Sequence, residues 1–289
     1  MSTPQRAAFR HLERLRVRWA EVDMQKIVFN GHYLMYFDTA VAGYWRAMAM
    51  PYHETMHALE GDLYARKATV EYLASARYDD ALEVGIRAGR IGNSSIVFHA
   101  AVFLGERCLV HGELLYVFAD PATQTSKPVP QKFRELLAAF EGGQPMVEVR
   151  LGAWAEFGND ARAIRQRVFI DEQRIPAALE WDDADAACVH ALAVNRWGLA
   201  LGTGRLLTPA PGVAQIGRMA VLGAMRGSGV GRALLSALVD AARQRGDREV
   251  LLHAQASAVP FYARAGFAER GAPFDEAGIP HVEMVRALV

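Results

Sequence analysis

A run of glycines between residues 226 and 232 is the stretch of this sequence best suited to chemistry. It reads Arg226-Gly227-Ser228-Gly229-Val230-Gly231-Arg232. Glycines permit a tight turn and bring backbone N–H groups close to a ligand. A helix that starts here adds unpaired N–H groups and a partial positive charge in its first turn. Because the two flanking arginines are suited to phosphate, the run predicts a turn that binds a diphosphate.

Two other kinds of phosphate loop do not fit this run. A Walker A loop needs Gly-Lys-Ser/Thr, whereas Arg232 and Ala233 follow Gly231. A dinucleotide fingerprint needs an acidic residue at the end of the next strand, and Asp247 and Glu249 precede that strand instead. The spacing alone also allows a structural turn without a ligand. The flanking elements are therefore needed to distinguish a ligand-binding turn from a structural one.

The flanking sequence predicts a strand, the turn and a helix, in that order. Residues 215–222 are apolar and β-branched, which favours a strand. Residues 233–243 are apolar at helical spacing, and Gly246 is a helix stop. A second strand is predicted at 249–254, followed by a short helix that ends in a glycine turn within 258–267.

This order resembles the GNAT superfamily of acyl-CoA-dependent acyltransferases. The loop pattern Arg/Gln-x-x-Gly-x-Gly/Ala of that superfamily is matched by Arg226, Gly229 and Gly231. Its Phe-Tyr-x-x-x-Gly-Phe signature is matched by Phe261, Tyr262, Gly266 and Phe267. The resemblance covers residues 145–289, and the segments 167–173, 180–185 and 278–281 look like the ElaA- and YjcF-like branch.

The resemblance implies roles for residues around the turn. Met219, Ala220 and Val221 would pair with the pantetheine arm of CoA, and Tyr262 would be the general acid for the departing thiolate. Candidate bases for an amine acceptor are His190, His253 and His281. Candidate partners of a cationic acceptor are Asp182, Asp183 and Asp185. The alternatives are core packing of the tyrosine, structural histidines and a solvated acidic loop.

The first half of the chain has a different pattern. Residues 33–48 are apolar nearly all round, which predicts a largely buried helix. Strands are predicted at 82–89, where apolar residues alternate with polar residues or glycine, and at 95–104 and 108–118. One buried helix followed by antiparallel strands suggests a sheet wrapped around a helix.

This order, together with segments 17–23 and 29–33, resembles the hotdog-fold acyl-CoA thioesterases of the 4-hydroxybenzoyl-CoA thioesterase type. The resemblance covers residues 10–141 and implies that Asp23 is the catalytic aspartate. The family often has glycine three residues after that aspartate, where this chain has Lys26. The departure concerns the geometry of the loop.

Thioester hydrolysis needs a carboxylate that activates water or attacks the carbonyl, and donors for the developing oxyanion. The backbone N–H groups around Asn30 and Gly31 are predicted to be those donors. The alternatives are that Asp23 only caps a turn and that Asn30 only caps the helix. Glu71 is either a second carboxylate or a solvated strand residue.

Composition limits the classes of partner. The 32 basic and 32 acidic residues balance, which excludes a strong electrostatic attraction to nucleic acid or an anionic membrane. The chain lacks a run of 18 apolar residues, and residues 1–10 lack the apolar core of a signal peptide, so a cytoplasmic protein is expected. Cys108 and Cys188 are expected to be buried free thiols.

We therefore predict an α+β fold of two domains: a hotdog domain at 1–142, with an antiparallel sheet around a central helix, and a GNAT mixed α/β sheet at 143–289. The expected protein hydrolyses an acyl-CoA thioester in its first domain and transfers an acetyl or acyl group from CoA to an amine acceptor in its second. We expect a homodimer or homotetramer formed through the hotdog domain, without a metal or redox cofactor. Two alternatives are a thioesterase regulated by an acyl-CoA-sensing second domain, and an N-acetyltransferase dimerised by an inactive hotdog scaffold.

Overall fold

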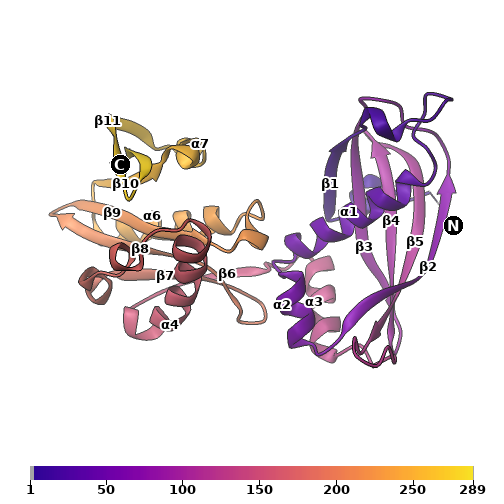
Figure 1. The fold of residues 1–289 in the computed structure, drawn as a ribbon, viewed down its shortest axis with the longest axis horizontal. Helices are drawn as coiled ribbons and strands as arrows, with labels where there is room; N and C mark the ends of the chain where they lie inside the picture. Colours follow the sequence, from indigo (N-terminus) through magenta and orange to yellow (C-terminus); the bar gives the residue numbers. More distant parts are fainter. Residues whose placement is uncertain (1–2, 289) are drawn as a thin grey trace. The chain divides into compact units, whose positions relative to one another are not determined.

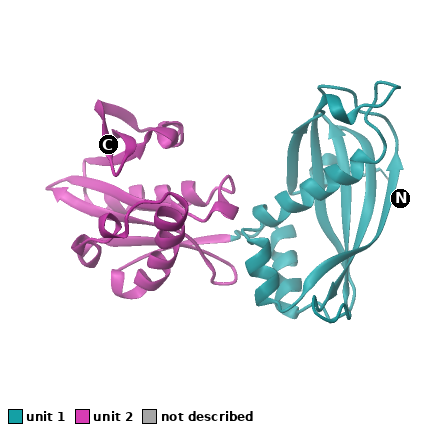
Figure 2. Ribbon diagram, viewed as in Figure 1, with its two compact units in different colours: residues 1–146 teal, residues 147–289 magenta. Residues whose placement is uncertain are grey.

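The computed structural model describes residues 3–288, and the chain divides into two compact units, 1–146 and 147–289 (Figure 2). Within the described residues, no helix combines the length and the apolar character needed to cross a membrane.

The first unit contains a five-stranded antiparallel sheet in the order β1-β3-β4-β5-β2. Its strands are β1 (His11–Arg16), β2 (Asp62–Tyr72), β3 (Ala81–Ile91), β4 (Ser95–Leu104) and β5 (Arg107–Ala119). Strand β2 pairs only with β5 and is an edge strand. The remaining elements of this unit are η1 (Arg6–Ala8), η2 (Trp19–Glu21), α1 (His32–Ala47), α2 (Tyr52–Ala58) and α3 (Gln131–Glu141).

Helix α1 lies across one face of this sheet (Figure 1). Tyr33, Phe37 and Tyr44 are buried on the side that faces the sheet. The opposite side is exposed, with 40% of Leu34 and 56% of Met35 accessible to solvent. The sequence predicts burial nearly all round, but in a single copy of the chain the sheet covers only one side of the helix.

The second unit contains a seven-stranded mixed sheet in the order β11-β12-β10-β9-β8-β7-β6. The strands are β6 (Val147–Gly152), β7 (Val189–Asn195), β8 (Ala200–Ala210), β9 (Val213–Val221), β10 (Glu249–Gln255), β11 (Ala268–Glu276) and β12 (Ile279–Ala287). The helical elements are α4 (Trp154–Arg165), the π-helix η3 (Gln166–Glu172), α5 (Ala177–Glu180), η4 (Asp183–Ala187), η5 (Gly223–Met225), α6 (Val230–Arg245), η6 (Ala256–Ala258) and α7 (Val259–Ala263).

Strands β9 and β10 are parallel, and they pair for only part of their length. Residues 213–216 are in register with 249–252, after which the two strands have no pairing with each other. On its other side β9 carries a β-bulge, because Arg218 and Met219 together oppose Gly204 of β8. Arg218 has a φ of 51°, in the left-handed region that is uncommon for a residue with a side chain. The ends of β9 and β10 therefore leave space for another group between them.

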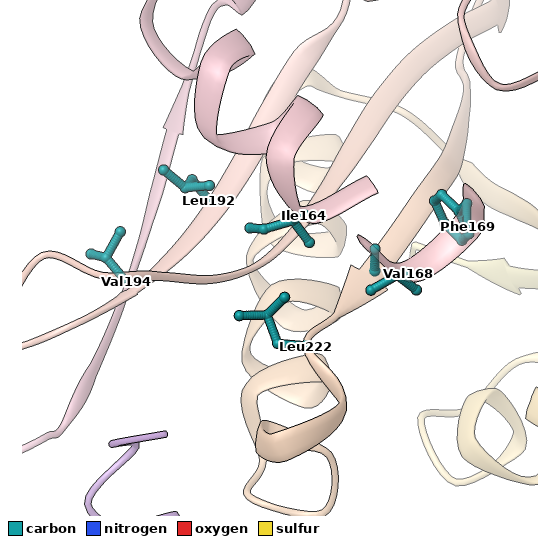
Figure 3. Close-up of a cluster of buried hydrophobic side chains, with 7 residues drawn as sticks. Ile164, Val168, Phe169, Leu192, Val194 and Leu222 are labelled. Carbon is teal, nitrogen blue, oxygen red and sulfur yellow. The ribbon is translucent and has the colours of Figure 1, made fainter. Parts of the chain in front are cut away.

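A buried apolar cluster fixes α4 and η3 on this sheet (Figure 3). Ile164 of α4 and Val168 and Phe169 of η3 pack with Leu192 of β7 and with Leu222, which follows β9. The cluster thereby holds the end of η3 near the turn that follows β9.

Helix α6 follows that turn and packs on β7, β8 and β9. Its buried side chains recur at helical spacing, from Leu234 and Leu235 to Leu238 and Val239. It ends at Gly246, whose φ of 88° is the left-handed conformation of a glycine C-cap, as the sequence predicts.

Candidate active sites

A short hairpin in the first unit presents Asp23. Val22 and Val28 form an antiparallel bridge, and the N–H of Asp23 donates to the carbonyl of Ile27 at 2.9 Å. Lys26 closes the turn, with its N–H 2.9 Å from the carbonyl of Asp23 and a φ of 61°. Lysine here adopts the left-handed conformation that glycine favours, so the loop keeps its turn without the glycine.

The Asp23 carboxylate is half-buried, and its Oδ1 accepts the N–H of Gln25 at 2.8 Å. This contact is the one expected if Asp23 caps a turn, the alternative role that the sequence allows. Within residues 3–288, the other carboxylate oxygen accepts no hydrogen bond. One oxygen is therefore used to hold the loop and one is available for chemistry.

Backbone donors lie at the start of α1, in the segment that follows the Asp23 hairpin. The N–H of Phe29 donates to the carbonyl of Glu21 at 2.9 Å, and that of His32 donates to the carbonyl of Phe29 at 2.9 Å. The N–H groups of Asn30 and Gly31 donate to no acceptor in the described part of the chain. Tyr72 donates its hydroxyl to the carbonyl of Asn30 at 3.1 Å, which fixes this peptide. These two N–H groups, at the positive end of a 16-residue helix, can stabilise a negative charge.

In the second unit, the glycine run forms the start of α6. Gly227 and Gly229 have φ values of 81° and 94°, a conformation that strongly favours glycine, so the turn itself accounts for glycine at both positions. Across the described residues, no hydrogen bond uses the N–H of Gly227, Gly229, Val230, Gly231 or Arg232. This row of free donors at the start of a 16-residue helix is an anion-binding arrangement.

Gly231 has no structural reason to be glycine. Its φ is not positive, and a Cβ atom there would come no nearer to the protein than 3.6 Å, an ordinary van der Waals contact. Glycine inside a helix costs roughly 1 kcal/mol relative to alanine. The close approach of a ligand to the backbone would explain the residue.

The two arginines that flank the run differ. Arg226 forms a bidentate ion pair with Glu172 of η3, at 2.5 and 2.7 Å, and donates its Nε to the carbonyl of Val221 at 3.2 Å. Hydrogen bonds from Arg226 lower the pKa of the Glu172 carboxyl. Arg232 is exposed and has no ion-pair partner among residues 3–288. Arg226 thus orders the turn, and Arg232 is the arginine left for phosphate.

A cavity of 530 Å³ opens where β9 and β10 diverge. Met219 of β9, His253 and Gln255 of β10 and Tyr262 of α7 line it. Gln255 donates to the side chain of Gln173 at 2.9 Å, which links β10 to the end of η3. Tyr262 packs against Phe261, at a ring-centroid distance of 4.9 Å, and in the described residues its hydroxyl has no hydrogen-bond partner. Burial raises the pKa of Tyr262 to about 12.

Comparison with known proteins assigns a family to each unit. The family described as acetyltransferase (GNAT) domain matches residues 183–288, and the thioesterase superfamily matches residues 25–117. The uncharacterized N-acetyltransferase YjcF of Bacillus subtilis (strain 168) is 35% identical over 128 residues, which are 44% of this chain and 90% of YjcF. The acyl-CoA thioester hydrolase YbgC of Escherichia coli O6:H1 is 29% identical over 131 residues, 44% of this chain and 92% of YbgC. A crystal structure of an acyl-CoA N-acyltransferase from Pseudomonas aeruginosa is 32% identical, covers 49% of this chain and 99% of its own, and has a TM-score of 0.45.

The chain is a fusion of a thioesterase domain and a GNAT domain. The predicted resemblance and fold class are confirmed: a hotdog-like antiparallel sheet with a helix comes first, and a mixed sheet with helices follows. Asp23 lies just before the segment that matches the thioesterase superfamily.

The three candidate histidines of the GNAT domain have different surroundings. His190 is buried with its Nε2 2.8 Å from the carbonyl of Asp185, and burial lowers its pKa. His281 lines the cavity, but its Nδ1 is 2.7 Å from the carbonyl of Ile279. His253 lines the cavity and is half-exposed.

Two of the three candidate aspartates of the GNAT domain are paired with arginines, Asp182 and Asp185, whereas Asp183 is exposed and has no ion-pair partner among residues 3–288. Arg205 contacts Asp182 at 2.6 Å and Asp185 at 2.8 Å. Arg165, which is 1% exposed, contacts Asp185 and Glu180 at 2.8 and 2.5 Å. These arginine partners leave no local pattern in the sequence, because the contacts join residues 15 to 23 positions apart on different elements.

Proposed function

We propose that this chain is a bifunctional acyl-CoA enzyme. Its thioesterase domain would hydrolyse an acyl-CoA thioester, and its GNAT domain would transfer an acetyl or acyl group from CoA to an amine. One observation carries the proposal. Each domain contains a 16-residue helix, α1 or α6, and backbone N–H groups at the start of that helix donate to no acceptor among residues 3–288. One set suits an oxyanion and the other a diphosphate.

In the thioesterase domain, Asp23 activates water or attacks the thioester carbonyl through its free carboxylate oxygen. The N–H groups of Asn30 and Gly31 stabilise the negative charge that develops on the carbonyl oxygen. One such donor contributes about 3 kcal/mol to lowering the barrier in other enzymes.

Asp23→Asn tests this assignment. Asparagine keeps a side-chain oxygen for the N–H of Gln25, so the loop is retained and only the charge is removed. We expect hydrolysis of acyl-CoA, screened over short, long and aromatic acyl groups, to fall by about 100-fold or more, with acetyl-CoA binding at the GNAT domain unchanged in calorimetry. Asp120→Asn is the matched control, because Asp120 also accepts backbone N–H groups of its own turn, at 2.8 and 3.0 Å. Normal hydrolysis by Asp23→Asn would show that the aspartate is not catalytic.

In the GNAT domain, the free N–H groups of Gly227 and of residues 229–232 would bind the CoA diphosphate, with the side chain of Arg232 beside them. The unpaired side of β9 at Met219, Ala220 and Val221 would bind the pantetheine arm, although the carbonyl of Val221 accepts a hydrogen bond from Arg226. Tyr262 would protonate the departing thiolate, because its raised pKa keeps the hydroxyl protonated at neutral pH.

Gly231→Asp tests the diphosphate site. An acidic residue in the first turn of a helix stabilises it by about 0.3–1 kcal/mol, so the fold is kept while the new charge repels the diphosphate. We expect acetyl-CoA binding in calorimetry to weaken at least about tenfold. Ser236→Asp is the control, since it adds the same charge in the second turn of α6. Equal affinities of the two variants would place the nucleotide elsewhere.

The exposed apolar side chains of the thioesterase domain support self-association. Leu34 and Met35 on α1 and Tyr72 at the end of the edge strand β2 are all at least 40% exposed. Large exposed apolar side chains and an open sheet edge are features of an interface. Light scattering of the full chain should therefore give a mass of at least twice 31.8 kDa.

A further inference from the structure

His253 differs from the other histidines of the GNAT domain because no backbone carbonyl holds its imidazole. Among the described residues, neither of its ring nitrogens forms a hydrogen bond, whereas His190 and His281 each have a ring nitrogen held by a backbone carbonyl. Its side chain is 36% exposed and lines the 530 Å³ cavity together with Met219 and Tyr262. The other histidine that lines the cavity, His281, is only 9% exposed, so His253 is the more accessible of the two to an acceptor.

Charged groups from two strands face His253. Its Nδ1 is 3.5 Å from Glu276 of β11, and its Nε2 is 3.9 Å from Glu283 of β12. The ring of Phe274, also on β11, lies edge-on to the imidazole of His253, and the two ring centroids are 5.0 Å apart. The same phenylalanine ring stacks against His281. Arg270 contacts Glu283 at 2.6 Å and so compensates its charge. Within residues 3–288, Glu276 has no arginine or lysine partner.

The other charged residues that line the cavity neutralise one another. Arg205 contacts Asp182 at 2.6 Å, and Arg218 contacts Glu180 and Asp182 at 3.3 Å. Glu276 is therefore the uncompensated charge at the cavity wall. A volume of 530 Å³ suits a small molecule.

We propose that His253 is the general base of acetyl transfer, and that Glu276 binds the ammonium group of an acceptor that is a small amine with a single positive charge. This inference rests on the proposed transferase activity of the GNAT domain. The arginines and carboxylates that line the rest of the cavity are paired with one another, so none of them is available to bind a second ionised group on the acceptor.

The protons and bonds of the reaction balance with these residues. His253 accepts a proton from the ammonium group, and the free amine attacks the thioester carbonyl to form the C–N bond. The C–S bond then breaks, and the thiolate takes the phenolic proton of Tyr262. The second proton lost by the nitrogen on amide formation restores the Tyr262 hydroxyl, and His253 returns its own proton to solvent.

His253→Gln tests the base. With phenethylamine as acceptor, we expect kcat to fall by about 100-fold at neutral pH, with acetyl-CoA affinity unchanged. The deficit should shrink as the pH approaches the pKa of the amine itself, near 10, because a free amine needs no base. A purely structural role would lower the rate by the same factor at every pH. That result, or a wild-type kcat, would overturn the assignment.

Glu276→Gln tests the recognition of charge. We expect KM for phenethylamine to rise about fivefold with little change in kcat, because a partly exposed ion pair contributes about that much to binding. Glu269→Gln is the matched control, on the same strand and exposed, outside the cavity lining. The wild type should prefer phenethylamine to glycine, which carries a carboxylate, and to 1,4-diaminobutane, which carries two charges. A preference for either of these would overturn the acceptor class. If the wild type acetylates no amine although acetyl-CoA binds, the transferase function itself fails.

Discussion

Tyr262 shows how burial determines what a side chain can donate. Its ring lies between Phe261 and Phe267, and this burial raises its pKa to about 12. The hydroxyl therefore stays protonated over the whole range in which an enzyme works. Since it also lines the cavity, its position is compatible with both the packing role and the chemical role that the sequence leaves as alternatives.

Tyr262→Phe should separate these two roles. Phenylalanine keeps the ring contacts, so acetyl-CoA affinity and folding at neutral pH should be unchanged, while acetyl transfer falls by about 100-fold. The wild type should also lose stability between about pH 10 and 12. The unfolded tyrosine has already released its proton there and the folded one has not, so stability falls as the pH rises. Rates and alkaline unfolding curves of both proteins check this, and an unchanged transfer rate would assign the tyrosine to packing alone.

At the scale of elements, a buried ionic network connects α4, α5, η4 and β8. The Arg165 guanidinium carbon lies 4.9 Å from the ring centroid of Trp181 and 5.8 Å from that of Trp154, and its nitrogens contact Glu180 and Asp185. Burial raises the pKa of Glu180. The network thus holds Glu180 and Arg205, two residues that line the cavity, in place.

Arg165→Met should destabilise the GNAT domain by about 3 kcal/mol, because it removes the most buried arginine partner of two buried carboxylates, and Asp185 then keeps only Arg205 and Glu180 only Arg218 among the described residues. The loss should be smaller at the lower of two pH values, since burial raises the pKa of Glu180 and protonation then removes its charge in the folded protein. Urea unfolding at the two pH values measures both effects. A loss that is equal at the two pH values would show that the missing contacts with tryptophan dominate.

The sequence predicts elements well where their signal is local. The strand, glycine turn and helix around residues 215–243 follow from spacing, because each depends on neighbouring residues. Strand β2 carries the polar stretch Ala-Arg-Lys-Ala-Thr and is extended because it pairs with β5, a long-range interaction that leaves no local pattern. The pair Arg226–Glu172 joins residues 54 positions apart, so the sequence assigns Arg226 to phosphate while the structure shows it bound to a carboxylate. The bulge at Arg218 likewise depends on register with β8.

At the scale of the whole molecule, each unit has its own core and its own candidate site. Both family resemblances can be identified from the sequence, because their motifs lie within one unit each. Residues 1–142 and 143–289 remain the predicted domains, and the compact units are 1–146 and 147–289. Coupling between the two sites is a property of the full chain, because each motif lies within one unit.

Calorimetric unfolding of the full chain with CoA should decide between two independent enzymes and a thioesterase regulated by a CoA sensor. We expect two transitions, because the two units have separate cores. CoA at about 100 times its dissociation constant stabilises the domain that binds it by about 2.7 kcal/mol, so the GNAT transition should move to higher temperature. In Gly231→Asp, whose affinity is expected to be about tenfold lower, the stabilisation should fall to about 1.4 kcal/mol and the shift of the GNAT transition should be roughly halved. If the thioesterase transition moves in the wild type and its shift is reduced by the same proportion in Gly231→Asp, occupancy of the GNAT domain is coupled to the thioesterase, and the sensor interpretation holds. A shift of the thioesterase transition that is the same in both proteins would instead report CoA bound at the thioesterase site.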